Sequence, residues 1–264
     1  MSKHREFILR PIESILEEVP LALRNIKPGL DTMGLYEYVM QSLFLKMTGF
    51  QEQKMKCLCW DLATDDYVYR YERYKKAPLG ECSDLKEKDI VWGDLIAHVA
   101  QMEGHAVNIT EEARSRIIDE TKHVIEDFYE QTNMEGWAQK EFHDYKMLIS
   151  NCSKECLTFK TKKTMELFYH CDNCARRNSP GNDGSICKIG TLEKAYKALF
   201  DHRNRCAHNT LSYQHNLPSL QTLSKKEHVF ENYFLHFALL IMIDKMIICM
   251  FRHCLEISNS DFSL

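Results

Sequence analysis

The sequence predicts an all-α protein, a helical bundle with additional helices in its N-terminal part. Three observations predict this class. Apolar residues recur at spacings of three and four in most segments, as they do on one face of an α-helix. No stretch alternates apolar and polar residues long enough to indicate a sheet. Only 10 Gly and 6 Pro occur in 264 residues, which excludes collagen-like and low-complexity chains.

Breaker and capping residues divide the chain into expected helices. The first covers 13–26 and ends before Pro28. Asp31 is expected to cap a second helix, which ends near Gly49. A capping box at Ser224 and Glu227 is expected to open the last helix. The remaining expected helices cover 52–74, 90–102, 108–129, 137–149, 157–169 and 190–208.

Two arrangements of these helices remain open. The chain can form one bundle, or residues 1–150 can form a helical N-terminal region of unassigned role that packs on a bundle at 151–264. We expect the second arrangement. Within the helix expected at 52–74, an aromatic stripe continues at helical spacing, and we expect it to face the core rather than to form a platform for base stacking. The stripe contains Trp60, Tyr67, Tyr71 and Tyr74.

Composition and cysteine usage predict a soluble cytoplasmic protein. Apolar residues make up 44% and charged residues 27%, with a net charge of −4. The apolar run at 7–10 is too short for a signal peptide. Eleven cysteines at irregular spacing indicate reduced thiols rather than a disulfide framework. The apolar stretch 234–251 contains His236, Asp244 and Lys245, so we expect a buried core helix and no membrane partner.

Cofactor motifs are sparse. The chain has no GxGxxG and no GxxxxGK[ST], so nucleotide binding through these loops is not expected. Cys171 and Cys174 have metal-ligand spacing, and a tetrahedral zinc site could be completed from nearby residues. Because a second CxxC is absent, the same cysteines can be small residues at a helix end. We expect no cofactor and keep a zinc-stabilised regulatory protein as a minor reading. The candidate zinc ligands are Cys171, Cys174, Cys187 and His170, with Cys152 and Cys156 as further options.

The most informative segment is 199–209. Arg203 falls where the apolar stripe of the preceding helix would continue. A buried-side arginine needs an anionic partner, which can be a carboxylate from another helix or a phosphate from outside. Asn204 and His208 are four residues apart and therefore lie on one helix face. Arg203 and His208 are five residues apart, about 140° around the axis.

These residue types suit the cleavage of RNA without a metal. The 2′-hydroxyl can attack the neighbouring phosphate if a base, an acid and a cation are present. Histidine accepts or donates a proton near neutral pH, and arginine forks onto two phosphate oxygens. One histidine and one arginine are few for this task, but two copies facing each other across a two-fold axis would supply a complete set.

The extended string at 203–209, Arg-Asn-x-x-Ala-His-Asn, is more specific than the spacing alone. With 12 His in the chain and as many Arg, about 0.5 Arg-x4-His pairs are expected by chance. The string resembles the HEPN ribonuclease motif, in the form found in prokaryotic abortive-infection (Abi) defence proteins. The order of elements resembles that family over 157–254. Thr210 departs from the pattern, because some HEPN toxins carry a modified tyrosine at this position.

The resemblance implies a HEPN-like bundle at 151–264 that dimerises so that two motifs meet in one cleft. It also implies metal-independent endoribonuclease activity in a toxin or anti-phage (antiviral defence) role. Arg203, Asn204 and His208 map onto the motif as catalytic residues. The implied partners are RNA, further copies of this chain in a homodimer or higher homo-oligomer, and a regulatory or antitoxin protein.

Local charge is compatible with RNA binding. Residues 153–208 contain 11 Lys and Arg against 6 Asp and Glu, although the chain as a whole is acidic. Lys197 and Arg205 flank the motif as candidate RNA contacts, but a solvated helix face would look the same. The alternative function is a non-catalytic HEPN-like helical interaction or antitoxin-type module. In that case Arg203 forms a structural ion pair and His208 interacts with the helix dipole.

Overall fold

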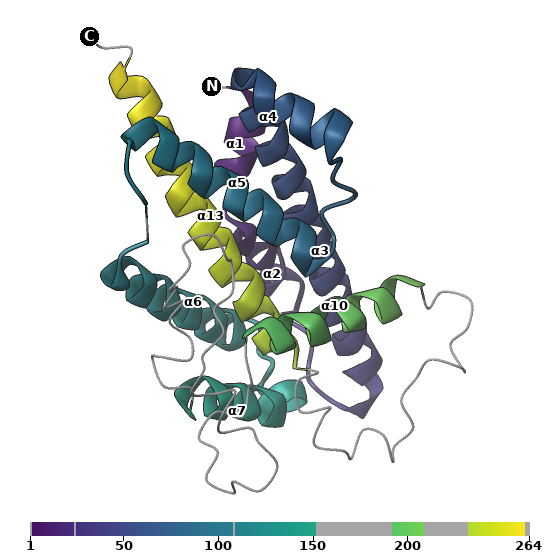
Figure 1. The fold of residues 1–264 in the computed structure, drawn as a ribbon. Helices are drawn as coiled ribbons and strands as arrows, with labels where there is room; N and C mark the ends of the chain where they lie inside the picture. The colour runs from purple at the N-terminus through teal and green to yellow at the C-terminus, as the bar shows by residue number, and fades with distance from the viewer. Residues whose placement is uncertain (1, 24, 108, 152–191, 209–231, 262–264) are drawn as a thin grey trace, which may run out of the picture.

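A computed structural model describes residues 2–23, 25–107, 109–151, 192–208 and 232–261. This part of the chain is helical and contains no strand, which confirms the all-α prediction (Figure 1). Two short 3₁₀ segments, η1 (Ile12–Glu18) and η2 (Leu30–Thr32), and one π-helical turn, η3 (Glu72–Lys76), connect the helices. The α-helices are α1 (Lys3–Leu9), α2 (Pro20–Leu23), α3 (Met33–Asp65), α4 (Tyr67–Tyr71), α5 (Leu85–Glu103), α6 (Glu111–Gln131), α7 (Glu135–Asn151), α10 (Leu192–His208) and α13 (Tyr233–Asp261).

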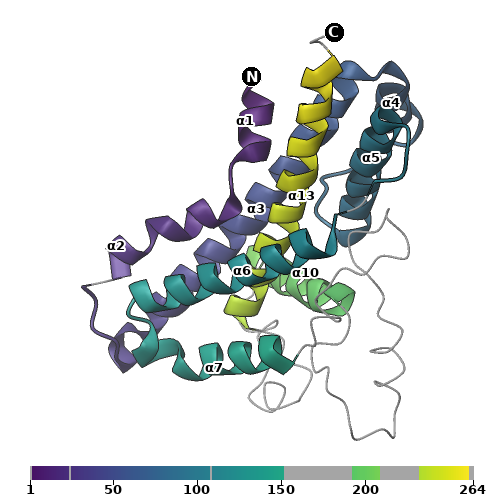
Figure 2. The same ribbon diagram turned by 90° about the vertical axis from the view of Figure 1, so that its left-hand side faces the viewer.

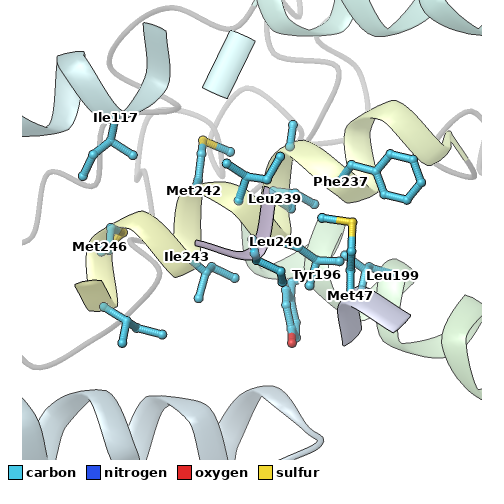
Figure 3. Packing of buried hydrophobic residues seen from close by; sticks show 14 of the residues in the cluster. Met47, Ile117, Tyr196, Leu199, Phe237, Leu239, Leu240, Met242, Ile243 and Met246 are labelled. Atoms are coloured by element: carbon cyan, nitrogen blue, oxygen red, sulfur yellow. The ribbon is translucent and has the colours of Figure 1, made fainter. Parts of the chain in front are cut away.

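The core surrounds α13. This helix packs against α3, α5 and α6, and Figures 1 and 2 show it running through the middle of the molecule between them. The close-up in Figure 3 shows side chains from α3, α6 and α10 around the first half of α13. Helices from both sides of residue 150 therefore contribute to one hydrophobic cluster. The domain boundary near residue 150 stays a prediction, because 152–191 lie outside the described residues.

The apolar helix α13 is long and apolar enough to cross a membrane, but 89% of its apolar window is buried inside the protein. Two charged residues inside this apolar helix, Asp244 and Lys245, have partners on other elements. The Asp244 carboxylate lies 2.5 Å from the Lys54 ammonium on α3. Lys245 lies 2.9 Å from Glu13 and 3.1 Å from Glu120. The expected buried core helix is confirmed, while the cytoplasmic location stays a prediction.

Several predicted helix boundaries are wrong in the N-terminal part. The expected break near Gly49 is absent, and α3 continues to Asp65. Residues on both sides of Gly49, such as Met47 and Met55, are buried, so tertiary packing outweighs the low helix propensity of one glycine. Asp31 lies within η2 and does not cap α3. Of the helix expected at 13–26, the structure has η1 and the short α2 instead.

Side-chain caps set three further boundaries. Asp66 has extended backbone angles and accepts a hydrogen bond from the Tyr69 amide at 2.9 Å, so α3 ends and α4 begins where one helix over 52–74 was expected. Asp84 accepts from the Glu87 amide at 2.7 Å and starts α5 five residues earlier than expected. Asn232 accepts from the Leu235 amide at 3.1 Å and caps α13, which begins at Tyr233; Ser224 and Glu227, expected to open the last helix, lie outside the described residues.

The helices expected at 108–129, 137–149 and 190–208 are confirmed as α6, α7 and α10. The helix expected at 157–169 lies outside the described residues. The aromatic stripe expected to face the core is exposed instead. The break at Asp66 ends the periodicity on which that prediction depended, and Trp60, which precedes the break, lies on an exposed side of α3. The exposed fractions are 57% for Trp60, 74% for Tyr67, 49% for Tyr71 and 44% for Tyr74.

Candidate functional site

The motif helix α10 is fixed against α3 and α13 by its apolar face. Ala195, Tyr196 and Leu199 on this face are buried, and Tyr196 and Leu199 appear beside α13 in Figure 3. The Tyr196 hydroxyl donates a hydrogen bond to Gln51 Oε1 on α3 at 3.2 Å. The Gln51 amide donates in turn to the backbone carbonyl of Leu240 on α13 at 3.3 Å. These bonds fix the orientation of α10 about its own axis.

Arg203 lies on the same side of α10 as Tyr196, because seven residues make almost two helical turns. Its Nη2 lies 3.1 Å from Glu52 Oε1 and 3.2 Å from Glu52 Oε2 on α3. The side chains of Arg203 and Glu52 are 24% and 14% exposed. Of the two anionic partners considered from the sequence, the structure contains the carboxylate from another helix.

Sequence reasoning did not identify Glu52 as a site residue. It precedes Arg203 by 151 positions, and nothing in its own neighbourhood marks it. What could have identified Glu52 is its position next to Gln51, because Gln51 binds Tyr196 on α10. Once that contact is known, a glutamate next to Gln51 is an obvious partner for an arginine two turns further along α10.

Asn204 contacts Arg203. The Arg203 Nη1 donates a hydrogen bond to Asn204 Oδ1 at 3.1 Å, so the guanidinium is shared between Glu52 and Asn204. His208 is the last residue of α10, and its side chain lies outside the described part of the chain. Helix geometry puts its backbone about 7.5 Å along the axis from Arg203. The predicted pairing of the Arg203 and His208 side chains stays a prediction.

A second cation, Lys88, is close enough to Arg203 and Glu52 for their charges to act on it. Lys88 on α5 is 1% exposed, donates to the Ser83 carbonyl at 2.6 Å and lies 5.5 Å from the ring centre of Tyr196. Burial lowers the pKa of Lys88 to about 8; the negative charge of Glu52 opposes this shift, and the positive charge of Arg203 adds to it. Lys88 is buried and cannot contact RNA directly, so it acts on Glu52 and Arg203 only through its electrostatic field.

The two candidate RNA contacts lie apart from the Arg203–Glu52 pair. Lys197 is on the exposed surface of α10. Arg205 Nη2 lies 3.4 Å from Nδ1 of His202, whose Nε2 lies 3.2 Å from the Tyr233 hydroxyl. His202 also packs against Phe44, with ring centres 5.3 Å apart. Arg205 therefore joins an aromatic contact between α3, α10 and α13.

The candidate zinc ligands Cys171, Cys174, Cys187 and His170 lie outside the described residues, as do Cys152 and Cys156. Among the residues that the structure describes, no group of three metal-ligating side chains occurs. Six described cysteines carry free thiols, which agrees with the expected reduced state for those positions. The zinc site stays a prediction.

Comparisons with protein-family models, with curated proteins and with solved structures found no match to this chain.

Proposed function

We propose that this protein is a metal-independent endoribonuclease of HEPN type, a toxin or anti-phage effector that acts in the cytoplasm and assembles its active site across a homodimer. The observation that carries the proposal is the position of Arg203. Its guanidinium lies near the C-terminal end of α10, bonded to Asn204, and remains 24% exposed. A cation at this place is accessible to a phosphate outside the protein, and it belongs to the same string as His208.

The proposed reaction is cleavage by the substrate's own 2′-hydroxyl. The 2′-oxygen attacks phosphorus as one His208 imidazole accepts its proton, and the bond from phosphorus to the 5′-oxygen breaks. A protonated His208 imidazole of the second copy donates a proton to the leaving 5′-oxygen. The Arg203 guanidinium neutralises charge on the phosphate oxygens, and Asn204 orients the guanidinium. The products carry 2′,3′-cyclic phosphate and 5′-hydroxyl ends.

Removal of the imidazole tests this proposal. The wild-type protein is expected to cleave single-stranded RNA in the presence of EDTA and to leave 2′,3′-cyclic ends. His208→Ala should lower the rate by about 10²–10⁴-fold, the usual contribution of general acid–base catalysis. His123→Ala is the matched control, because His123 is an exposed imidazole on α6 outside the motif. Full activity of His208→Ala would remove this residue from the mechanism.

One observation favours the second candidate function, a non-catalytic helical interaction or antitoxin-type module. That reading expects Arg203 to form an ion pair within the protein, and Arg203 does so with Glu52. It predicts a stable oligomer with no RNA turnover. An RNA cleavage gel together with light scattering separates the two functions, since the module should give an oligomer and intact RNA at every enzyme concentration.

A further inference from the structure

The exposed aromatic residues at the end of α3 line a cavity. Its volume is about 440 Å³, and its walls include the rings of Trp60, Tyr67, Tyr71 and Tyr74. The rings of Trp60 and Tyr74 lie 5.7 Å apart at 50° to each other. Four rings that remain 44–74% exposed around one cavity are unusual on a soluble surface, where apolar concentrations of this kind mark binding sites.

The walls of the cavity are held by specific contacts. Arg70 on α4 donates to the carbonyl oxygens of Ala63 at 2.7 Å and Thr64 at 3.2 Å, which ties α4 to the last turn of α3. Arg73 forms a two-pronged ion pair with Asp94 on α5, with both distances at 2.7 Å. Arg73 belongs to the π-helical turn η3, a kind of turn that is frequent at functional sites. These contacts therefore hold in place the backbone that carries the aromatic rings.

The rim of the cavity is cationic. Residues 67–76 contain four basic side chains and one acidic side chain. Arg73 is paired with Asp94, and Lys76 with Glu72. Within the part of the chain that the structure describes, the other two basic residues, Arg70 and Lys75, form no ion pair, and both line the cavity. Aromatic walls below a positively charged rim match a nucleotide, whose base is flat and apolar and whose phosphate is anionic.

The cavity and the motif are connected along one face of α3. Glu52, Lys56 and Trp60 follow each other at intervals of four, so they lie on successive turns of one side of the helix. Glu52 binds Arg203, and Trp60 belongs to the cavity wall. The rise between Glu52 and Trp60 is about 12 Å. In Figure 1, α4 covers the end of α3 near both chain termini, and α10 crosses α3 further down.

We propose that this cavity binds bases of single-stranded RNA by stacking, and that it holds the strand whose phosphates reach Arg203. The proposal rests on the proposed function for the identity of the nucleic acid. Each base has a π-face, so the aromatic rings bind without strict sequence preference. Duplex RNA is excluded because its bases are already stacked on one another.

Binding of a non-cleavable strand tests the proposal separately from catalysis. A labelled 2′-O-methyl oligoadenylate has no free 2′-hydroxyl, so its affinity can be measured by fluorescence anisotropy whether or not the protein cleaves RNA. Trp60→Ala and Tyr71→Ala should each weaken binding by about 5- to 150-fold. Trp60→Phe should keep most of the affinity, because a flat ring remains. The matched control is Tyr38→Ala, which removes a 68% exposed tyrosine from the opposite end of α3.

Three results would overturn the proposal. They are unchanged affinity in both Trp60→Ala and Tyr71→Ala, equal affinity for a duplex of the same length, and absence of any binding by the wild-type protein. If Trp60→Ala instead dissociates an oligomer without changing RNA affinity, the cavity is occupied by a second copy of the chain. If the oligonucleotide binds through the aromatic rings but RNA is never cleaved, the proposed catalysis is wrong and the binding site stands.

Discussion

Arg203 shows what a sequence can and cannot predict about one residue. Its position on an apolar stripe predicts the need for an anion, and the structure provides one in Glu52. The identity of that anion depends on how α10 lies on α3, which is set by buried contacts such as Tyr196 with Gln51. No local pattern contains this information. The ion pair also gives Arg203 two separable roles, one in stability and one in phosphate binding.

A double-mutant comparison separates these two roles. Arg203→Met leaves the largely buried Glu52 carboxylate without its cation and should reduce the free energy of unfolding by about 1–3 kcal/mol. Adding Glu52→Gln removes the unpaired charge and should recover most of this loss. RNA cleavage should not recover, because the guanidinium is still absent. Denaturant unfolding and a cleavage assay measure the two effects, and recovered cleavage in the double variant would make Arg203 purely structural.

Lys88 gives a prediction about pH. Its pKa is lowered to about 8 in the folded protein by burial, and it lies near 10.4 in an unfolded chain. Between these values the unfolded state binds more protons, so this group makes the folded state more stable as pH rises from 8 towards 10. The gain should approach about 3 kcal/mol and should be missing in Lys88→Met. Unfolding free energies of both proteins at pH 7 and pH 10 test this, and equal pH dependence would contradict it.

At the scale of elements, periodicity predicts the existence of helices better than their ends. The apolar pattern correctly predicted α6, α7 and α10, and the charged residues inside 234–251 correctly indicated a buried helix. Gly49 does not end α3, because the packing of α3 against α1 and α13 outweighs the low helix propensity of one glycine, and no local pattern contains that packing. Asp66 caps a new helix, so a periodicity counted across it predicts a core face where the aromatic residues are exposed.

The contact between α3 and α13 contains a sealed ion pair, and its removal should be costly. Lys54 and Asp244 have fully buried side chains, and burial lowers the pKa of Lys54 and raises that of Asp244. Asp244 also accepts a hydrogen bond from the Ile12 amide at 2.9 Å. Asp244→Asn leaves the Lys54 charge uncompensated and should reduce the free energy of unfolding by about 3–5 kcal/mol.

A paired replacement is the control for this prediction. Lys54→Met with Asp244→Leu removes both charges together and should destabilise less than Asp244→Asn alone, with a remaining loss from the orphaned Ile12 amide. Chemical denaturation followed by circular dichroism measures both variants. An Asp244→Asn protein as stable as the wild type would mean that the pair does not hold α3 and α13 together.

For the whole molecule, fold class is predictable from sequence because it depends on patterns that repeat along the chain. The helical class is correct although the ends of α3 and α4 differ from the predicted ones. The site is less predictable because it depends on contacts across long separations: Arg203 with Glu52, and Trp60 with Tyr74 across the break at Asp66. The proposed activity is harder still to predict from sequence, because it depends on contacts between two copies of the chain.

The most direct test of the account is subunit mixing. Wild-type protein and His208→Ala are combined in equal amounts under conditions that allow subunits to exchange, and RNA cleavage is measured in EDTA. If each active site needs His208 from both copies, only wild-type homodimers are active, and random assortment leaves about one quarter of the activity of an all-wild-type sample. Half of the activity would mean that each chain works alone and would contradict an active site shared between two copies.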